Sequence, residues 1–352
     1  MNNRPASTLY DVARAAGVST ATVSRVVHDQ DKVRPATRQR VLEAIEALGY
    51  IPDAAAQSMA RQRKEVIGLV TIESRGPDTD IEQEGLLFTE EVLRGVELVL
   101  SGIGWSVLIS VLRAEDRPGA FRQLQKISAK VDGMLIAEGI VDSAQLAQLA
   151  ARVPVVLVSG ALDEPHADVV DADNRGGSIA LARHLIEQHG LTRLHYIAGP
   201  AEAPDAQERR TSFAEAVAGY QGAAITGFFE GRFAAVSGQL AVRELLAEAK
   251  RPLPDAVVCG NDQMALGAMR ELQAAGIRVP ADIAVAGFDD IHVGSLLTPA
   301  LTTVRQPMRL LGERACSLLL ERLADPSRPR QAERLPTELI IRESCGCPPV
   351  TG

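Results

Sequence analysis

The sequence predicts two kinds of structure in one chain: a small all-α head and a larger α/β core made of two doubly wound lobes. Between residues 8 and 28, apolar residues recur with a helical period on either side of a glycine. From Val66 onward, short apolar runs typical of strands alternate with helical stretches, and the alternation restarts near Leu194. The seven runs are Val66–Ile72, Trp105–Val111, Met134–Ala137, Val155–Val158, Leu194–Ala198, Val257–Cys259 and Ile283–Phe288. Such alternation indicates parallel sheets covered on both faces, and two series indicate two lobes. A chain of 352 residues is long enough for about two or three domains.

Two helices joined by a tight turn are predicted over Leu9–Ala16 and Thr20–His28. In the first helix, apolar residues fall at positions i, i+3, i+4 and i+7, which is one helix face. Thr8 and Ser19 are each placed to cap the helix that follows. Gly17 stands where the chain must leave the first helix, because glycine adopts positive φ at little cost.

The second helix has an apolar side of three valines, and its other side carries small and hydroxylated residues and the cation Arg25. Helix, glycine turn and helix is the arrangement of a DNA reader whose second helix enters the major groove. Small groups near the start of that helix let the backbone approach the bases, and Arg25 can pair bidentately with a guanine. The spacing leaves open an ordinary helical hairpin in a small core.

A third helix is predicted over Pro35–Leu48, with Val41, Ile45 and Leu48 facing inward. Arg34 stands at its cap position, where serine or aspartate would cap better. The basic residues near this helix are candidates for phosphate contact, with a solvated charged surface as the alternative: Lys32, Arg34, Arg38 and Arg40.

Charge is divided unevenly along the chain, whose net charge is −8. Residues 1–64 hold ten Lys and Arg against six Asp and Glu, a net charge of +4. The remaining residues hold 27 against 39, a net charge of −12. A basic head on an acidic body is typical of a protein whose head binds DNA while its body is repelled by phosphate.

Residues 51–64 are predicted to link head and core. Asp53 can cap an alanine-rich segment, Ala54–Arg61, which is too short to be a stable helix by itself. This segment is therefore expected to be disordered alone and to fold when a partner receives it.

Three blocks of the head, LYDVA at 9–13, AGVS at 16–19 and TVSRV at 22–26, resemble the lactose/galactose repressor (LacI/GalR) family of bacterial transcription factors. The resemblance implies a helix-turn-helix DNA-binding domain at 1–50, followed by a hinge helix and linker. In the family, the hinge helix pairs with its dimer mate in the minor groove and wedges a leucine into the operator centre. Met59 stands at the position of that leucine and Ala56 at that of a close-packing alanine, with a mere linker as the alternative. The implied DNA-binding residues are Leu9, Tyr10, Ser19, Thr20, Ala21, Thr22, Ser24, Arg25, His28, Arg34, Thr37, Tyr50, Ala56 and Met59.

From residue 65 to 352, the resemblance implies an effector-binding and dimerisation domain with the two-lobed fold shared by periplasmic binding proteins and these repressors. The chain then crosses between the lobes three times, near Asp171, Arg305 and Arg334. Lobe 1 accordingly spans about 65–171 and 305–334, and lobe 2 about 172–304 and 335–348. Ligands of such folds bind between the lobes, beyond the carboxyl ends of the strands.

The resemblance also implies the effector-binding residues Ser159, Arg209, Phe233, Asn261, Asp289 and Gln306. In the family the arginine anchors ligand hydroxyls, the aromatic residue packs on a sugar ring, and the aspartate accepts from hydroxyls. A carboxylate, amides, an arginine and an aromatic platform are also what a neutral polyhydroxyl ligand needs on chemical grounds alone. Asp289 as a loop cap and Phe233 as plain core are the alternatives.

Some positions depart from the lactose repressor. Its inward Asn and Asp of the first lobe align with Ala137 and Ser159, and Glu138 beside them is a candidate to take over. The recognition helix reads Thr20-Ala21 where that repressor has two larger side chains. Both the effector and the operator are therefore expected to differ from lactose and its operator.

The predicted function is a sequence-specific transcriptional regulator, most simply a repressor of a carbohydrate-uptake or catabolic operon, controlled by a small sugar or sugar derivative. Its partners are palindromic double-stranded DNA, the effector and a second copy of the chain, because a two-fold protein reads a palindrome. Whether the ligand releases DNA or, as in purine-responsive members, promotes binding stays open. No heptad helix follows Arg342, so a dimer is expected. The alternative is a solute-binding transport protein, which the head and the missing apolar signal region oppose, so the cytoplasm is the expected location.

Neither an enzyme, a cofactor nor a membrane protein is predicted. The chain has no P-loop, no G-x-G-x-x-G after a strand and no apolar run near the roughly 18 residues of a membrane span. The six histidines show no pairing on a helix face, since His184 and His189 are five residues apart. The four scattered cysteines suit a reducing compartment. Cys345 and Cys347 could form half a metal site, but no matching Cys/His pair accompanies them, so no metal is expected.

Overall fold

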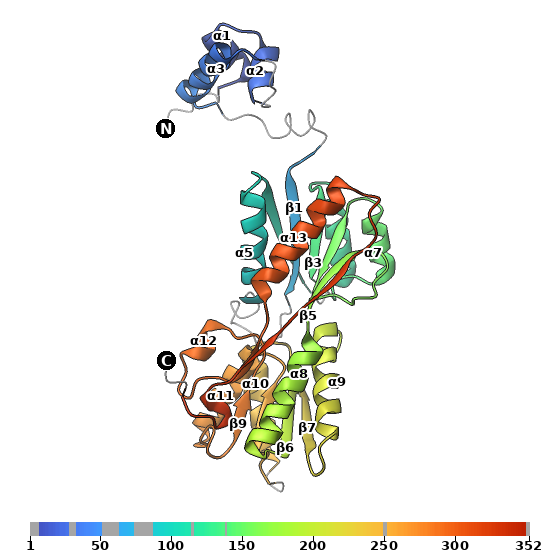
Figure 1. Cartoon of the computed structure of the whole chain (residues 1–352), viewed down its shortest axis with the longest axis vertical. Coiled ribbons are helices and arrows are strands. Elements are labelled where there is room, and N and C mark those ends of the chain that lie inside the picture. Colours follow the sequence, from blue (N-terminus) through green and yellow to red (C-terminus); the bar gives the residue numbers. More distant parts are fainter. Residues whose placement is uncertain are drawn as a thin grey trace. The chain divides into compact units, whose positions relative to one another are not determined.

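The computed structural model describes residues 7–27, 33–50, 63–73, 87–113, 116–137, 139–248 and 252–349. The chain divides into two compact units, Met1–Glu65 and Val66–Gly352 (Figure 1). The predictions for His28, Ala56, Met59 and Glu138, and for the hinge helix at 54–61, lie outside the described residues. Among the described helices, none is both long and apolar enough to cross a membrane.

The first unit is a head of three helices, α1 (Leu9–Ala16), α2 (Thr20–Val27) and α3 (Pro35–Leu48). Its core is made of small aliphatic side chains, of which Val12, Val23 and Val41 are fully buried. The inward placement predicted for Leu48 is wrong, because this side chain at the last residue of α3 is 36% exposed. Ala44, one turn earlier, contributes to the core instead.

The helix ends of the head are fixed by local contacts. Thr8 forms a capping box, in which the Asp11 N–H donates to Thr8 Oγ1 at 3.3 Å and the Thr8 N–H donates to Asp11 Oδ2 at 3.0 Å. Gly17 ends α1 with a φ of 64°, a conformation that favours glycine. Ser19 Oγ accepts from the Thr22 N–H at 3.2 Å, whereas Arg34 makes no side-chain cap for α3.

The capping box gives a first prediction. Thr8→Ala is expected to destabilise the head by about 1 kcal/mol, because amide groups at the start of α1 lose their side-chain acceptor. The head's unfolding midpoint in urea, followed by NMR amide signals of the full chain, measures this. Glu46→Gln, an exposed change on α3, is the control and should leave the midpoint in place. Equal midpoints for both variants would contradict a stabilising role of the cap.

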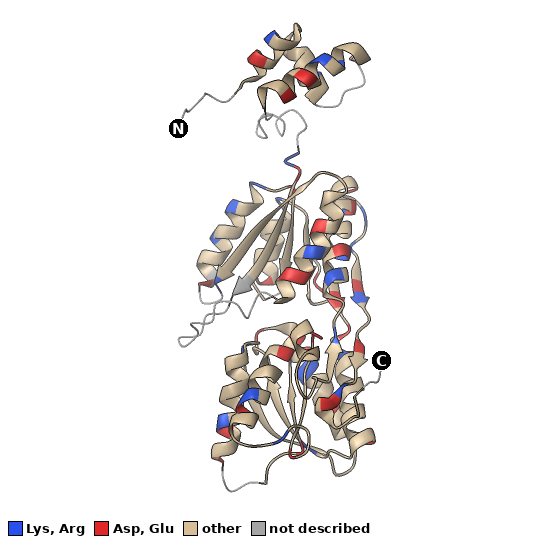
Figure 2. Cartoon of the chain, turned by 90° about the vertical axis from the view of Figure 1, so that its left-hand side faces the viewer, with Lys and Arg blue, Asp and Glu red and all other residues tan. Residues whose placement is uncertain are grey.

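The second unit begins with a parallel six-stranded sheet in the order β11-β5-β4-β3-β1-β2. Its strands are β1 (Val66–Glu73), β2 (Ser106–Arg113), β3 (Gly133–Ala137), β4 (Val155–Val158), β5 (Asp168–Ala172) and β11 (Ala332–Leu335). One face packs against α6 (Arg117–Ser128) and α7 (Ser143–Ala150), and the other against α5 (Leu87–Ser101) and α13 (Met308–Ala324). In Figure 2 most strand residues are tan, and charged residues lie mainly on the helices and joining segments, as expected for a sheet buried on both faces.

A second parallel sheet has the order β7-β6-β8-β9. Its strands are β6 (Arg193–Ala198), β7 (Ala224–Glu230), β8 (Ala256–Cys259) and β9 (Ala284–Ala286). Helices α8 (Asn174–Arg183) and α9 (Pro204–Ala218) cover one face, and α10 (Ala235–Ala247) and α11 (Asp262–Ala274) the other. The antiparallel pair β10 (Thr303–Arg305) and β12 (Glu338–Ile340) lies beside β9, and the short helices are α12 (His292–Ser295) and η3 (Glu343–Cys345). The chain passes between the two sheets after β5, β10 and β11 (Figure 1).

The predicted architecture of a helical head and a doubly wound core is confirmed. The seven apolar runs that were predicted as strands all overlap strands of the two sheets, although Ile283–Phe288 is shortened to β9. The apolar runs do not indicate β5 or β7, nor the short strands β10, β11 and β12.

A π-turn, η2 (His184–Gln188), follows α8 and corrects one prediction. In an α-helix, residues five apart are rotated by about 140° and diverge. The wider turn brings residues five apart toward one face. The rings of His184 and His189 accordingly meet edge to face, with centroids 5.0 Å apart, so the prediction that these two histidines do not pair is wrong.

Candidate functional site

The exposed side of α2 carries some of the residues that are predicted to bind DNA. Ala21 and Arg25 on α2 and Tyr10 on α1 are exposed, and Tyr10 is 71% accessible. Thr20 and Ser24 are half-buried at the edge of this face. This side of α2 therefore combines small side chains near the start of the helix with the exposed guanidinium of Arg25, a combination that suits entry into a major groove.

The other predicted DNA-binding residues of the head have varied environments. The hydroxyls of Ser19 and Thr22 lie 2.9 Å apart and form a hydrogen bond, and Ser19 Oγ also caps α2. Arg34 is exposed and Thr37 is half-buried at the start of α3. Leu9 and Tyr50 pack against the core of the head, so at least part of each side chain stabilises the fold.

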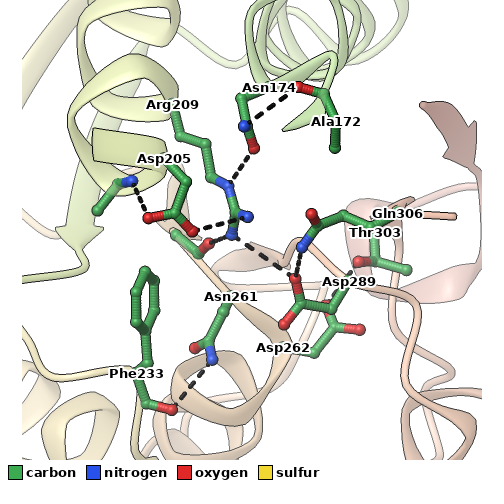
Figure 3. A network of polar contacts seen from close by, with 12 residues as sticks. Ala172, Asn174, Asp205, Arg209, Phe233, Asn261, Asp262, Asp289, Thr303 and Gln306 are labelled. Carbon is green, nitrogen blue, oxygen red and sulfur yellow. Dashed lines mark hydrogen bonds and ion pairs between the residues drawn. The ribbon is translucent and has the colours of Figure 1, made fainter. Parts of the chain in front are cut away.

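The second sheet carries a polar network centred on Arg209 of α9 (Figure 3). This side chain is only 3% exposed. Its guanidinium donates to Asn174 Oδ1 at 2.8 Å, to the Gly260 carbonyl at 2.8 Å and to Asp205 Oδ2 at 3.2 Å. The Arg209 carbon Cζ also lies 4.0 Å from the centre of the Phe288 ring. The guanidinium is therefore fixed in orientation before any ligand arrives.

Asp289 follows β9 and completes this network. Its carboxylate lies 3.6 Å from Arg209 Nη1 and accepts from Gln306 Nε2 at 2.5 Å. Burial raises the pKa of Asp289 to about 6, while Arg209 and the bond from Gln306 act in the opposite direction. Asp289 has a φ of 125°, a backbone conformation that a non-glycine residue keeps only when its surroundings hold it.

Asn261 and Phe233 lie beside the network. The Asn261 side chain caps α11 by accepting from the Met264 N–H at 3.0 Å, and it donates to the Phe233 carbonyl at 3.0 Å. Asn261 therefore has a structural task in the fold. Phe233 has a φ of 62° and is half-buried, and its ring centre lies 5.9 Å from Arg209 Cζ. One part of this ring packs on the core while another faces the guanidinium.

Five of the six predicted effector residues are thus gathered, and one is not. Arg209, Phe233, Asn261, Asp289 and Gln306 lie in or beside the network of Figure 3. Ser159 directly follows β4 in the first sheet and has a φ of 59°. Ala137 is the last residue of β3, the neighbouring strand of the same sheet.

Four polar residues of this site are not among the predicted effector-binding residues. Asn174 and Asp205 hold the Arg209 guanidinium, and the i, i+4 spacing of Asp205 and Arg209 on one helix was a signal that could have been used. Asp262 is fully buried beneath the network, where its carboxylate accepts from Thr303 Oγ1 at 2.5 Å and from the Ile291 N–H at 2.9 Å. Burial and the nearby Asp289 charge raise the pKa of Asp262. Asp171, at the end of β5, accepts from Asn174 Nδ2 at 3.3 Å.

Asp171 makes the stability of the core depend on pH. Burial raises its pKa from 3.8 to about 7, with Glu208 and Asp205 acting in the same direction. The native state then holds a proton that the unfolded state has lost, so the free energy of unfolding falls as pH rises from about 4 to about 7. The difference between these two pKa values corresponds to at most about 4 kcal/mol.

Asp171→Asn, which stays neutral, is expected to reduce this fall in stability. Urea unfolding of the core between pH 4.5 and 8 measures it for both proteins. Asp163→Asn removes an exposed carboxyl and serves as the control that keeps the original profile. Parallel profiles for Asp171→Asn and the unmodified protein would show that Asp171 does not titrate in this range.

Comparison with known proteins gives a consistent result. Residues 8–53 match the model of bacterial regulatory proteins of the lacI family, and residues 182–345 match a periplasmic binding protein-like domain. The chain is 33% identical over 345 residues to the HTH-type transcriptional repressor PurR of Aliivibrio fischeri, covering 96% of this chain and 98% of that protein.

Two solved structures extend the comparison. The lac repressor dimer bound to operator and the anti-inducer ONPF matches with a TM-score of 0.84 and 29% identity, over 96% of this chain and 99% of that chain. The complex of the transcriptional regulator CelR with cellobiose matches with a TM-score of 0.70 and 34% identity, over 97% and 100% of the two chains.

The similarity to repressors spans both the head and the core. It excludes the alternative of a solute-binding transport protein, which has no reason to carry a DNA-reading head. The relatives are transcriptional repressors and not enzymes, and the lac repressor dimer was solved bound to its operator and the anti-inducer ONPF. This protein is a DNA-binding transcriptional repressor, and the chain belongs to the LacI family of bacterial regulatory proteins.

Proposed function

We propose that this repressor controls a carbohydrate-uptake or catabolic operon, and that a small sugar-like effector binds between the two lobes of residues 65–352. One observation carries the proposal: residues that follow three parallel strands converge on the Arg209 guanidinium, namely Phe233 after β7, Gly260 after β8 and Asp289 after β9. Ligands of doubly wound folds bind at this end of the sheet.

The chemistry of this site favours a neutral, hydroxyl-rich ligand. Asp289 can accept from a hydroxyl, and the half-buried Phe233 ring offers an apolar face of the size of a sugar ring. Ser159 would contribute from the first lobe, at the end of β4. Among similar solved structures, CelR is in complex with cellobiose, and a regulator from Enterococcus faecium with 25% identity has bound ribose.

A thermal-shift panel tests the class of effector. Mono- and disaccharides, including cellobiose and ribose, are compared with nucleobases and nucleosides on the full chain. A ligand present at 100 times its dissociation constant adds about 2.7 kcal/mol to the stability of the native state, which raises the melting temperature by several degrees. A shift with a sugar that is lost in Phe233→Ala supports the proposal. Shifts with nucleobases alone would overturn it.

We further propose that a homodimer reads a palindromic operator in the cytoplasm. The two heads and the paired hinge segments with Met59 would bind together, and the effector would shift the relative pose of the lobes and so the spacing of the hinges. Selection of random duplexes with the full-length protein should enrich a two-fold symmetric sequence. Enrichment of no symmetric sequence would contradict the proposal.

Arg25 is the residue that we expect to read a base directly. Arg25→Lys removes the bidentate geometry while keeping the charge, so discrimination at one base pair should fall by about 1–3 kcal/mol. Arg40→Lys on α3 is the matched control, because a phosphate contact carries no sequence information. Competition between the selected operator and single-base variants measures the difference. An unchanged preference in Arg25→Lys would show that this side chain does not read a base.

A further inference from the structure

Four side chains with metal-binding atoms meet where the end of α8 lies against the C-terminal segment. His184 and His189 flank the π-turn after α8, and Cys345 and Cys347 lie in the C-terminal segment. One nitrogen or sulfur atom from each of the four residues lies within 4.8 Å of the other three.

The spacing of these atoms resembles that of a tetrahedral site. Zinc bonds of about 2.3 Å to sulfur and about 2.05 Å to nitrogen give a sulfur–nitrogen edge of about 3.6 Å in a regular tetrahedron. Three such edges are 3.4 Å (Cys345 Sγ to His184 Nε2), 3.8 Å (Cys347 Sγ to His184 Nε2) and 3.3 Å (Cys347 Sγ to His189 Nε2). Cysteine–histidine hydrogen bonds alone explain pairs at such distances, but they do not require all four groups to share one centre.

Two unusual backbone conformations produce this arrangement. The π-turn places His184 and His189 on one side of the helix end, and π-turns are frequent at functional sites. Gly346, between the two cysteines, has a φ of 105°, which turns the chain sharply. A residue with a Cβ atom would be strained at this φ, so glycine permits the turn that places Cys345 and Cys347 beside the histidines.

Two of the four side chains are buried and the other two are accessible. Cys345 is 2% exposed and His184 is 7% exposed, whereas His189 and Cys347 are half-buried and would give an ion access. The Thr302 hydroxyl lies 3.1 Å from Cys345 Sγ, where it can donate to a thiolate. Metal-bound ligands are commonly held by such outer hydrogen bonds.

We propose that His184, His189, Cys345 and Cys347 bind one zinc ion. Two thiolates with two imidazoles in a tetrahedron are typical of zinc, and four protein ligands leave no position for substrate, which is typical of a structural site. The ion would fasten the C-terminal segment after β12 to the end of α8, two parts of the second lobe separated by more than 150 residues. The histidine pair that the sequence analysis did not find for Cys345 and Cys347 is therefore supplied by the π-turn.

The test uses the untagged full-length protein, because a polyhistidine tag itself binds zinc. After purification under reducing conditions without chelator, elemental analysis is expected to find one zinc per chain. After removal of zinc, cobalt(II) should give the visible spectrum of a tetrahedral ion with thiolate-to-cobalt charge transfer, and Cys347→Ser should reduce that charge-transfer band by about half. Chelation should lower the melting temperature of the core by several degrees.

His189→Gln is the mildest substitution of a histidine ligand, because this side chain is half-buried whereas His184 is buried. Its zinc affinity is expected to fall at least about 100-fold, while His292→Gln, an exposed change on α12, should keep full affinity. Three results would overturn the proposal: equal affinity of the two variants, a six-coordinate cobalt spectrum, or a disulfide between Cys345 and Cys347 in the freshly purified protein.

Discussion

Replacing Arg209 with methionine is expected to destabilise the core by about 3–5 kcal/mol and to abolish the response of operator binding to the effector. Methionine keeps much of the apolar contact with Phe288 but removes every donor of the guanidinium. Asp205, Asp289 and the Gly260 carbonyl then lose a buried partner, which costs more than the net value of the original contacts.

Arg210→Met is the matched control on the same helix. Arg210 is exposed, and its Cζ lies 4.7 Å from the centre of the Phe228 ring, so its loss should cost no more than about 1 kcal/mol. Urea unfolding of the core compares the two variants, and a titration of operator complexes with effector compares their response. Arg209→Lys keeps the positive charge but not the planar guanidinium with its several donors. Its stability should therefore lie between those of Arg209→Met and the unmodified protein.

If Arg209→Met and Arg210→Met had the same unfolding midpoint, the network of Figure 3 would not be a stabilising element of the fold. If Arg209→Met were destabilised but still responded to the effector, the guanidinium would hold the fold without contributing to the effector site. The two readouts therefore separate the structural claim from the functional one.

The parts of the fold that depend on neighbouring residues could be predicted from the sequence. The caps at Thr8 and Ser19 and the glycine at position 17 act within one turn of chain, and their predicted roles match the observed contacts. Leu48 was misplaced because helical periodicity says which residues share a face but not where the neighbouring helices end.

The parts that depend on distant residues could not be predicted in the same way. β5 was missed because Asp168 and Asp171 break its apolar run, and the partners that make Asp168 acceptable in a buried strand lie more than 150 residues away. β7 was missed because its residues alternate between exposed and half-buried, as on an edge strand. Arg209 was identified only through the family resemblance, and its holders Asn174 and Asp205 became visible only with distances.

The same reasoning explains the histidine and cysteine cluster. Sequence spacing correctly described His184 and His189 as a poor pair for an α-helix, and it contained no signal for the π-turn that brings them together. Motif analysis therefore cannot find a metal site whose ligands come from a π-turn and from a distant segment, whereas it can find one contained in a single loop.

Asp168 gives the second prediction of large effect. Its carboxylate is fully buried at the start of β5 and lies 2.9 Å from Arg322 Nη2 and 2.7 Å from Arg328 Nη2. It also accepts from the Gln331 N–H at 2.7 Å, next to β11. One carboxylate therefore joins α13, the segment after it and the edge of the first sheet. Asp168→Ala leaves two largely buried guanidinium groups without their anion, so the core should lose about 3–5 kcal/mol.

Glu333→Ala is the matched control for Asp168→Ala, because it breaks a pair between Glu333 of β11 and Arg314 of α13. Both side chains of this pair are partly exposed, 26% for Glu333 and 37% for Arg314. Such a pair is worth at most about 1 kcal/mol. For a core of this size, the melting temperature should fall by roughly 5–8 °C in Asp168→Ala and by no more than about 2 °C in Glu333→Ala. Similar shifts in the two variants would mean that the guanidinium groups of Arg322 and Arg328 reach water once the carboxylate is gone. The contact that joins α13 to β5 would then be replaceable, and burial of charge would not be what holds β11 at the edge of the sheet.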